Sequence, residues 1–131
     1  MNLKAFLLVG AGGAAGSMAR YGVSLVVTKL THPDPNVANF PYATLTINVV
    51  GSLIIGILFG LLARHQWLQM GGYLLLASGF CGGFTTFSTF ALENVTLMQK
   101  GQSAMAMVYI GLSVVVGLLL CRAGMWLTGW S

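Results

Sequence analysis

A polar, glycine-broken stretch interrupts a long apolar segment in the second half of this chain. Residues 79–90 read Gly-Phe-Cys-Gly-Gly-Phe-Thr-Thr-Phe-Ser-Thr-Phe, with apolar runs before them at 74–77 and after them at 91–98. Hydrocarbon cannot hydrogen-bond a peptide group, so non-helical backbone persists at membrane depth only inside protein or beside water or an ion. Two adjacent glycines and four hydroxyls argue against an unbroken helix facing lipid. We therefore take this stretch as the candidate functional centre.

The composition indicates that the whole chain lies in a membrane. Of its 131 residues, 56% are hydrophobic and only 6% are charged, whereas soluble domains carry about 25% charged residues. At about 20 apolar residues per crossing, the length allows four spans, which we place at 3–28, 41–63, 72–98 and 103–126. No length is left for a soluble catalytic or nucleic-acid-binding domain. We predict an all-α integral membrane protein with one four-helix transmembrane domain over 1–131 and a broken third helix.

The first predicted span has a competing interpretation as a cleaved leader. Lys4 would then be its basic start, and Ala15 or Ala19 would lie near the cleavage site. Against this interpretation, apolar character resumes over 23–27, and removal of the segment would leave only three spans. We therefore favour a membrane helix.

Cations in the short loops give no clear orientation. The side that holds the N-terminus, the second connector and the C-terminus carries Lys4, Arg64 and Arg122, against Lys29 and Lys100 on the other side, with Arg20 a few turns inside the first helix. An excess of Lys and Arg normally decides which loops stay cytoplasmic. Because neither side has an excess, the chain could insert either way, and one copy could pair with an inverted second copy. A fixed orientation with weak bias is the alternative.

Small and polar residues recur every four positions in the second span, which places them on one helix face: Thr44, Asn48, Ser52, Gly56 and Gly60. Glycines at this spacing are typical of close helix packing. The amide of Asn48 needs partners in hydrocarbon. It either lines a pathway or binds a neighbouring helix, and the stripe itself favours neither.

The first and fourth spans carry similar stripes. Gly12, Gly16 and Arg20 share a face of the first span, where Arg20 either snorkels to the nearer membrane surface or marks the mouth of an anion pathway. In the fourth span, Ser113 is expected to hydrogen-bond back to its own helix. Tyr109 is a hydrogen-bond donor on a mostly apolar face.

Phenylalanines recur every three residues in the third span, at Phe84, Phe87 and Phe90. Such rows usually serve packing. However, an aromatic ring has a positive edge, so rings placed edge-on beside a path can favour an anion without a titratable cation. The hydroxyls of Ser88 and Thr89 can donate to the same anion. Together these residues predict a narrow path with neutral donors, suited to a small anion and hostile to cations.

The few titratable residues give little support to proton transport or enzyme chemistry. Glu93 is the only acid in the predicted spans, and we expect it to form an ion pair with Lys100 or Arg20. His32 and His65 both fall in loops without an acid, cysteine or serine partner in a plausible site. The chain is therefore not expected to be an enzyme.

The third-span motif and the second-span asparagine resemble those of a known family. The sequence GGFTTFSTF at 82–90, Asn48 within TINVVGS at 46–52, and the early Gly12-x-x-x-Gly16-x-x-x-Arg20 pattern are similar to the Fluc (CrcB) family of microbial fluoride channels. Length, number of spans and balanced loop charges agree as well. The resemblance covers essentially the whole chain.

This resemblance implies a fluoride-selective ion channel in the bacterial inner membrane, with several membrane crossings. It implies an antiparallel homodimer with two pathways, through which cytoplasmic fluoride leaves down its gradient without ATP or proton coupling. It also implies a structural sodium ion at the dimer centre, held by the backbone carbonyls of Gly82 and Thr85 from each copy. The pathway residues taken from the resemblance, together with the polar candidates of the other spans, are Asn48, Phe87, Phe90, Ser88, Thr89, Tyr109, Ser113 and Arg20.

Two other functions compete with this interpretation. A small proton-coupled exporter would have a similar size and dual topology, but it depends on an acid deep in the first span, where this chain has none. A channel, unlike such an exporter, conducts without an imposed proton gradient. A non-transporting subunit of a larger complex would explain the glycine stripes but not the third-span motif. Such a subunit would transport no ions when reconstituted alone.

Overall fold

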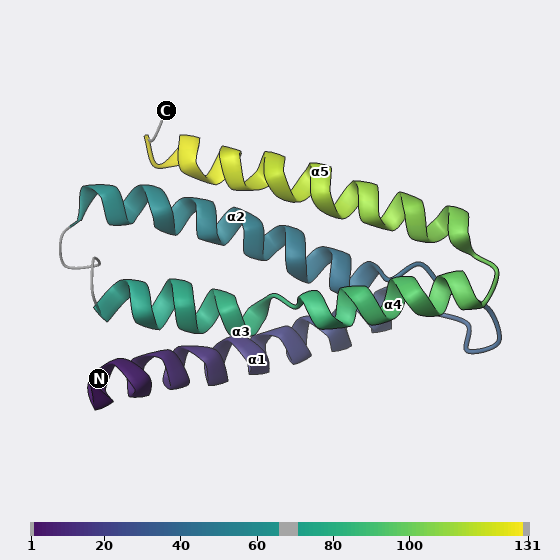
Figure 1. Cartoon of the computed structure of the whole chain (residues 1–131), viewed down its shortest axis with the longest axis horizontal. Helices are drawn as coiled ribbons and strands as arrows, with labels where there is room; N and C mark the ends of the chain where they lie inside the picture. The colour runs from purple at the N-terminus through teal and green to yellow at the C-terminus, as the bar shows by residue number, and fades with distance from the viewer. Residues whose placement is uncertain (1, 66–70, 130–131) are drawn as a thin grey trace.

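A computed structural model describes residues 2–65 and 71–129, and every regular element within them is helical (Figure 1). The elements are α1 (Leu3–Thr31), α2 (Tyr42–Arg64), η2 (Tyr73–Cys81), α3 (Gly82–Phe84), α4 (Phe87–Gln99) and α5 (Ser103–Leu127). The segments η2, α3 and α4 follow one another along a single interrupted rod, which we call the third rod. It runs beside α1 and α2 (Figure 1). The predicted all-α class is confirmed.

Three helices of the described chain are long and apolar enough to cross a membrane: α2, the third rod over Tyr73–Gln99, and α5. The expectation of several membrane crossings is confirmed for these three. Helix α1 has 29 residues, which is ample length, but its glycines, its two lysines and Arg20 make it less apolar. The first of the four predicted spans therefore stays a prediction.

The glycine stripe of α1 packs on the first half of the third rod. Gly12 and Gly16 are both buried. A Cβ added to Gly12 would lie 2.8 Å from the backbone nitrogen of Phe80, and one added to Gly16 would lie 2.8 Å from that of Phe84. Backbone atoms of a packed helix cannot swing aside as a side chain can. The stripe thus lets two helices approach closely.

Replacing Gly16 with alanine should destabilise the protein by about 1–3 kcal/mol, because the new methyl group overpacks a backbone contact. Gly22→Ala is the matched control on the same helix, since a Cβ there meets no atom within 4 Å; it should be neutral or stabilising by up to about 1 kcal/mol. Thermal unfolding in detergent measures both variants. Equal midpoints for the two would contradict the close contact.

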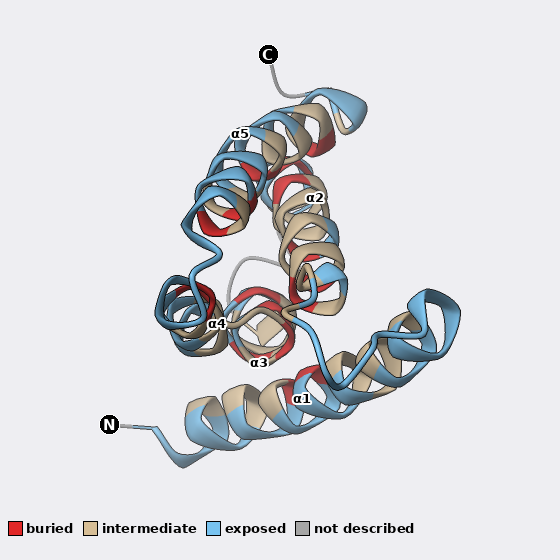
Figure 2. Cartoon of the chain, turned by 90° about the vertical axis from the view of Figure 1, so that its right-hand side faces the viewer, coloured by how far each residue is buried: buried red, intermediate tan, exposed pale blue. Residues whose placement is uncertain are grey.

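The third rod breaks at Thr85 and Thr86, inside the stretch for which a break is predicted. Thr85 has φ −81° and ψ 159°, and Thr86 has φ −150° and ψ 119°, so both are extended. Viewed along the rods, α4 lies to one side of α3 (Figure 2). Before the break the rod packs on α1, and after it α4 packs on α5. The break thus moves the chain from one neighbouring helix to another.

Helices α2 and α5 pack together through the second half of the α2 stripe. A Cβ at Gly56 would meet the backbone of Cys121, and one at Gly60 would meet the side chain of Thr128. On α5, Gly124 lies against the backbone of α2 in the same way. The packing interpretation of the stripe holds for its glycines, and Asn48, two turns earlier, faces the third rod.

Candidate functional site

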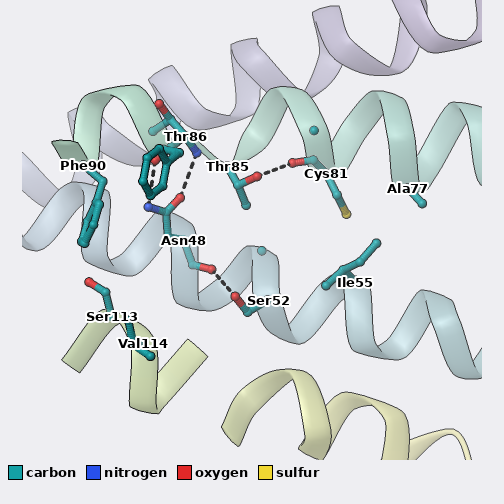
Figure 3. Close-up of a pocket in the computed structure, with 13 residues that line it drawn as sticks. Asn48, Ser52, Ile55, Ala77, Cys81, Thr85, Thr86, Phe90, Ser113 and Val114 are labelled. Carbon is teal, nitrogen blue, oxygen red and sulfur yellow. Dashed lines mark hydrogen bonds between the residues drawn. The ribbon is translucent and has the colours of Figure 1, made fainter. Parts of the chain in front are cut away.

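An open groove of about 500 Å³ lies beside the break, between α2, the third rod and α5 (Figure 3). None of the thirteen residues that line it is charged. The predicted site residues that it brings together are Asn48, Gly82, Thr85, Phe87, Phe90 and Ser113. A groove with this lining offers neutral hydrogen-bond groups and aromatic rings rather than a fixed charge.

Asn48 holds the break through two hydrogen bonds to one residue. The N–H of Thr86 donates to Asn48 Oδ1 at 2.9 Å, and Asn48 Nδ2 donates to the Thr86 carbonyl at 3.1 Å (Figure 3). The side-chain amide thus acts as an extra peptide group that pairs with extended backbone. An amide nitrogen carries two protons, so one N–H remains for another acceptor. Asn48 thus binds a neighbouring segment and also lines the groove, so both of the roles open to it stay possible.

The backbone carbonyls around the break differ in their hydrogen-bond partners. The Cys81 carbonyl accepts from the Thr85 N–H at 3.0 Å and from Thr85 Oγ1 at 2.8 Å. The Gly83 carbonyl accepts from Arg20. Within residues 2–65 and 71–129, no hydrogen bond reaches the carbonyls of Gly82 or Thr85. The two carbonyls named for the predicted sodium site are therefore available as ligands.

Arg20 contacts backbone rather than the membrane surface. Its Nε donates to the Gly83 carbonyl at 3.1 Å, and Ser17 Oγ lies 3.5 Å from the same oxygen. Both residues also line a second, smaller groove of about 270 Å³ together with Thr86 and Thr89. The end of α3 thus supplies Arg20 with a backbone acceptor that neither alternative, snorkelling or a pathway mouth, had predicted.

The predicted track of hydroxyls is divided between two faces. Thr86 caps α4: its Oγ1 accepts from the Thr89 N–H at 3.3 Å and donates to Thr89 Oγ1 at 3.1 Å. Thr89 faces the second groove, whereas Ser88 is exposed and lines neither groove. Thr86 lines both grooves and was not among the predicted site residues. Its signal was present, since threonine is a favoured residue just before a helix begins.

The aromatic residues form a chain from the groove into the core. The rings of Phe87 and Phe90 have centroids 5.8 Å apart, and those of Phe90 and Tyr109 are 5.0 Å apart. Phe87 is 79% exposed, whereas Tyr109 is fully buried. A large apolar ring beside an open groove is a surface that a partner or lipid must cover.

Tyr109 and Glu93 bind each other. The Tyr109 hydroxyl donates to Glu93 Oε1 at 3.1 Å. The described residues contain no ion pair between Glu93 and Lys100 or Arg20, so that expectation is wrong. Arg20 is engaged by Gly83, and the buried tyrosine reaches the carboxylate instead.

Ser113 has a buried hydroxyl without a hydrogen-bond partner in the described part of the chain. The expected bond to its own helix is therefore wrong. In Figure 3 this hydroxyl points from α5 toward the side of the groove where Phe90 lies. A buried hydroxyl left unpaired is costly, so a water molecule or an anion in the groove would be a suitable acceptor for its proton.

Comparisons with known proteins agree on one family. The family model described as "CrcB-like protein, Camphor Resistance (CrcB)" matches residues 7–125. Relatives named fluoride-specific ion channel FluC include one from Nitrobacter winogradskyi, 44% identical over 95% of this chain and 94% of its own. Another from Paracoccus denitrificans is 43% identical over 92% of this chain and 90% of its own. A third, from Azobacteroides pseudotrichonymphae, is 39% identical over 88% of each.

Proposed function

This chain belongs to the CrcB family, and from that premise we propose that it conducts fluoride passively through the groove beside the break. As a relative of fluoride-specific ion channels, it is a multi-pass membrane channel for fluoride and not an enzyme. The proposal concerns the route, the assembly and the driving force. Cytoplasmic fluoride would leave down its own gradient, across the bacterial inner membrane, without ATP or proton coupling.

One observation carries the proposed route: the groove at the break combines free donors with aromatic rings and no charged lining residue. The Ser113 hydroxyl has no hydrogen-bond partner among the described residues, and Asn48 keeps one N–H after binding Thr86. Helix α4 begins at the groove with Phe87, and the first N–H groups of a helix have no partner within it. Thr89 and Ser88 would extend the route beyond the groove, and Tyr109 would support Phe90 from behind.

Fluoride suits such a route because it is small and strongly hydrated. Its water shell must be replaced by close donors, and hydroxyl and N–H groups can approach a small ion closely. The positive edges of the Phe87 and Phe90 rings would favour the anion while the rings exclude water. Chloride is larger, so the same donors would surround it less completely.

The open side of the groove is best covered by a second, inverted copy. Phe87 is 79% exposed. The carbonyls of Gly82 and Thr85, which have no partner among residues 2–65 and 71–129, cannot face lipid, where an unsatisfied group costs several kcal/mol. Balanced loop charges allow one copy to insert each way. Two copies related by a twofold axis would enclose two grooves and hence two pathways. A single-molecule count of one copy per conducting unit would rule this assembly out.

Two breaks facing each other would bring four carbonyls together, those of Gly82 and Thr85 from each copy. Carbonyl oxygens suit a hard cation such as sodium. The ion would satisfy acceptors that the break releases and would hold the two copies together. Replacing sodium by an organic cation during reconstitution should lower fluoride efflux. Unchanged efflux after exhaustive sodium removal would remove this ion from the proposal.

Liposomes that contain only this protein should release fluoride and retain chloride when a gradient of either anion is imposed. Efflux should not need a pH gradient, because no Asp, Glu, His, Lys or Arg lines the groove. Ion-selective electrodes measure both anions, and empty liposomes are the control. Silence of the purified protein would favour a subunit of a larger complex, and efflux only under a proton gradient would favour an exporter.

A further inference from the structure

Arg20 and Ser17 reach the break from α1, a helix that contributes no residue to the groove lined by Asn48. Arg20 Nε lies 3.1 Å from the Gly83 carbonyl oxygen, and Ser17 Oγ lies 3.5 Å from it. Gly12 and Gly16 precede Arg20 on the same face and pack α1 against the third rod. Because these glycines let α1 approach the third rod closely, the guanidinium of Arg20 lies beside the last turn before the break.

In an unbroken helix, the Gly83 carbonyl would accept from the N–H of Phe87, four residues later. The extended Thr85 and Thr86 carry Phe87 out of reach, and Arg20 donates in its place. If Arg20 were lost, both the carbonyl and the Phe87 N–H would lack a partner. Closing the helix across 83–87 would pair them again, and hydrocarbon strongly favours paired backbone.

We infer that Arg20 is a positioning residue whose Nε hydrogen bond keeps the Gly83 carbonyl out of helical pairing and so holds the third rod open at the break. Its importance for conduction rests on the proposed function of the groove. In this role the donated hydrogen bond matters and the charge is secondary, in contrast to a cation that attracts anions to a pathway mouth.

Three replacements of Arg20 separate these roles. Glutamine has its Nε2 three carbons from Cα, where arginine has Nε, so Arg20→Gln keeps a donor to the carbonyl and removes the charge. Arg20→Met reaches the same ε position with a methyl group and removes both the donor and the charge. Arg20→Lys keeps the charge, with its nitrogen one atom further out. Lys29→Gln removes an equal charge from an exposed position on the same helix and is the matched control.

Fluoride efflux from liposomes should fall about tenfold in Arg20→Met, the effect expected for a lost hydrogen bond to a charged group. Arg20→Gln should keep at least roughly one third of the wild-type rate, since its hydrogen bond remains, and Lys29→Gln should match the wild type. Hydrogen exchange followed by mass spectrometry reports on peptides that cover 83–90. Exchange there should slow in Arg20→Met, because the Phe87 amide gains an acceptor, and stay unchanged in Arg20→Gln.

Equal loss of efflux in Arg20→Gln and Arg20→Met, with normal efflux in Arg20→Lys, would overturn the inference in favour of the charge. Wild-type exchange over 83–90 in Arg20→Met would overturn it as well. If Arg20→Met does not fold, a folded but inactive Arg20→Gln is sufficient to reject the role. Should the wild type fail to conduct fluoride, the proposed function fails, while the exchange measurement still decides whether Arg20 holds the break.

Discussion

Replacing Asn48 with aspartate should reduce fluoride efflux by about 100-fold or more, the largest effect that we expect from one substitution. The carboxylate has the shape of the amide and can still accept from the Thr86 N–H. It cannot donate to the Thr86 carbonyl, and it places a negative charge beside that carbonyl and in the proposed anion route. Each buried group left unpaired costs about 1–3 kcal/mol, and about 1.4 kcal/mol is a factor of ten.

Asn36→Asp is the control for this substitution. It makes the same chemical change in the exposed loop between α1 and α2, so efflux should stay at the wild-type rate. Size-exclusion chromatography in detergent shows whether Asn48→Asp still folds and assembles. A folded Asn48→Asp protein with normal efflux would mean that conduction needs neither the amide's hydrogen bond to the Thr86 carbonyl nor a groove lining without charge.

Replacing Phe87 and Phe90 together with leucine should lower efflux by about 100-fold, and each single replacement by about tenfold. Leucine keeps much of the apolar volume but has no positive ring edge. An aromatic contact contributes about 0.5–1.5 kcal/mol beyond its buried area. A loss of about 1.4 kcal/mol lowers the rate about tenfold, so losing both rings lowers efflux about 100-fold. Phe87→Leu is the cleaner single test, because Phe90 also packs against Tyr109.

Phe6→Leu is the control for the phenylalanine variants, since Phe6 is 61% exposed on α1 and does not line the groove. The liposome assay gives the rates, and chromatography should show that all variants elute as the wild type does. Normal fluoride efflux from both single variants would remove the rings from the proposed pathway. Loss of efflux together with a changed elution volume would instead indicate a role in assembly.

Several sequence-based expectations failed where they depended on which helix would lie opposite. Glu93 was expected to meet a cation but meets the hydroxyl of Tyr109, because helix packing brings α4 onto α5. Ser113 was expected to bond to its own helix, yet in the part of the chain that the structure describes its hydroxyl beside the groove has no partner. Rules based on local sequence predict the hydrogen bonds that a side chain can form with its own helix. For these two residues, the neighbouring helix determined the side-chain environment instead.

The sequence by itself determined the membrane class and the position of the break. Paired glycines, four hydroxyls and apolar flanks all act within a few residues of one another, so their effect can be deduced without a fold. Only the tertiary structure decided what holds the break. Asn48 reaches Thr86 across 38 residues of chain, and Arg20 reaches Gly83 across 63. A four-residue stripe fits packing, snorkelling and pathway lining equally well, and the choice depends on the helix against which that face packs.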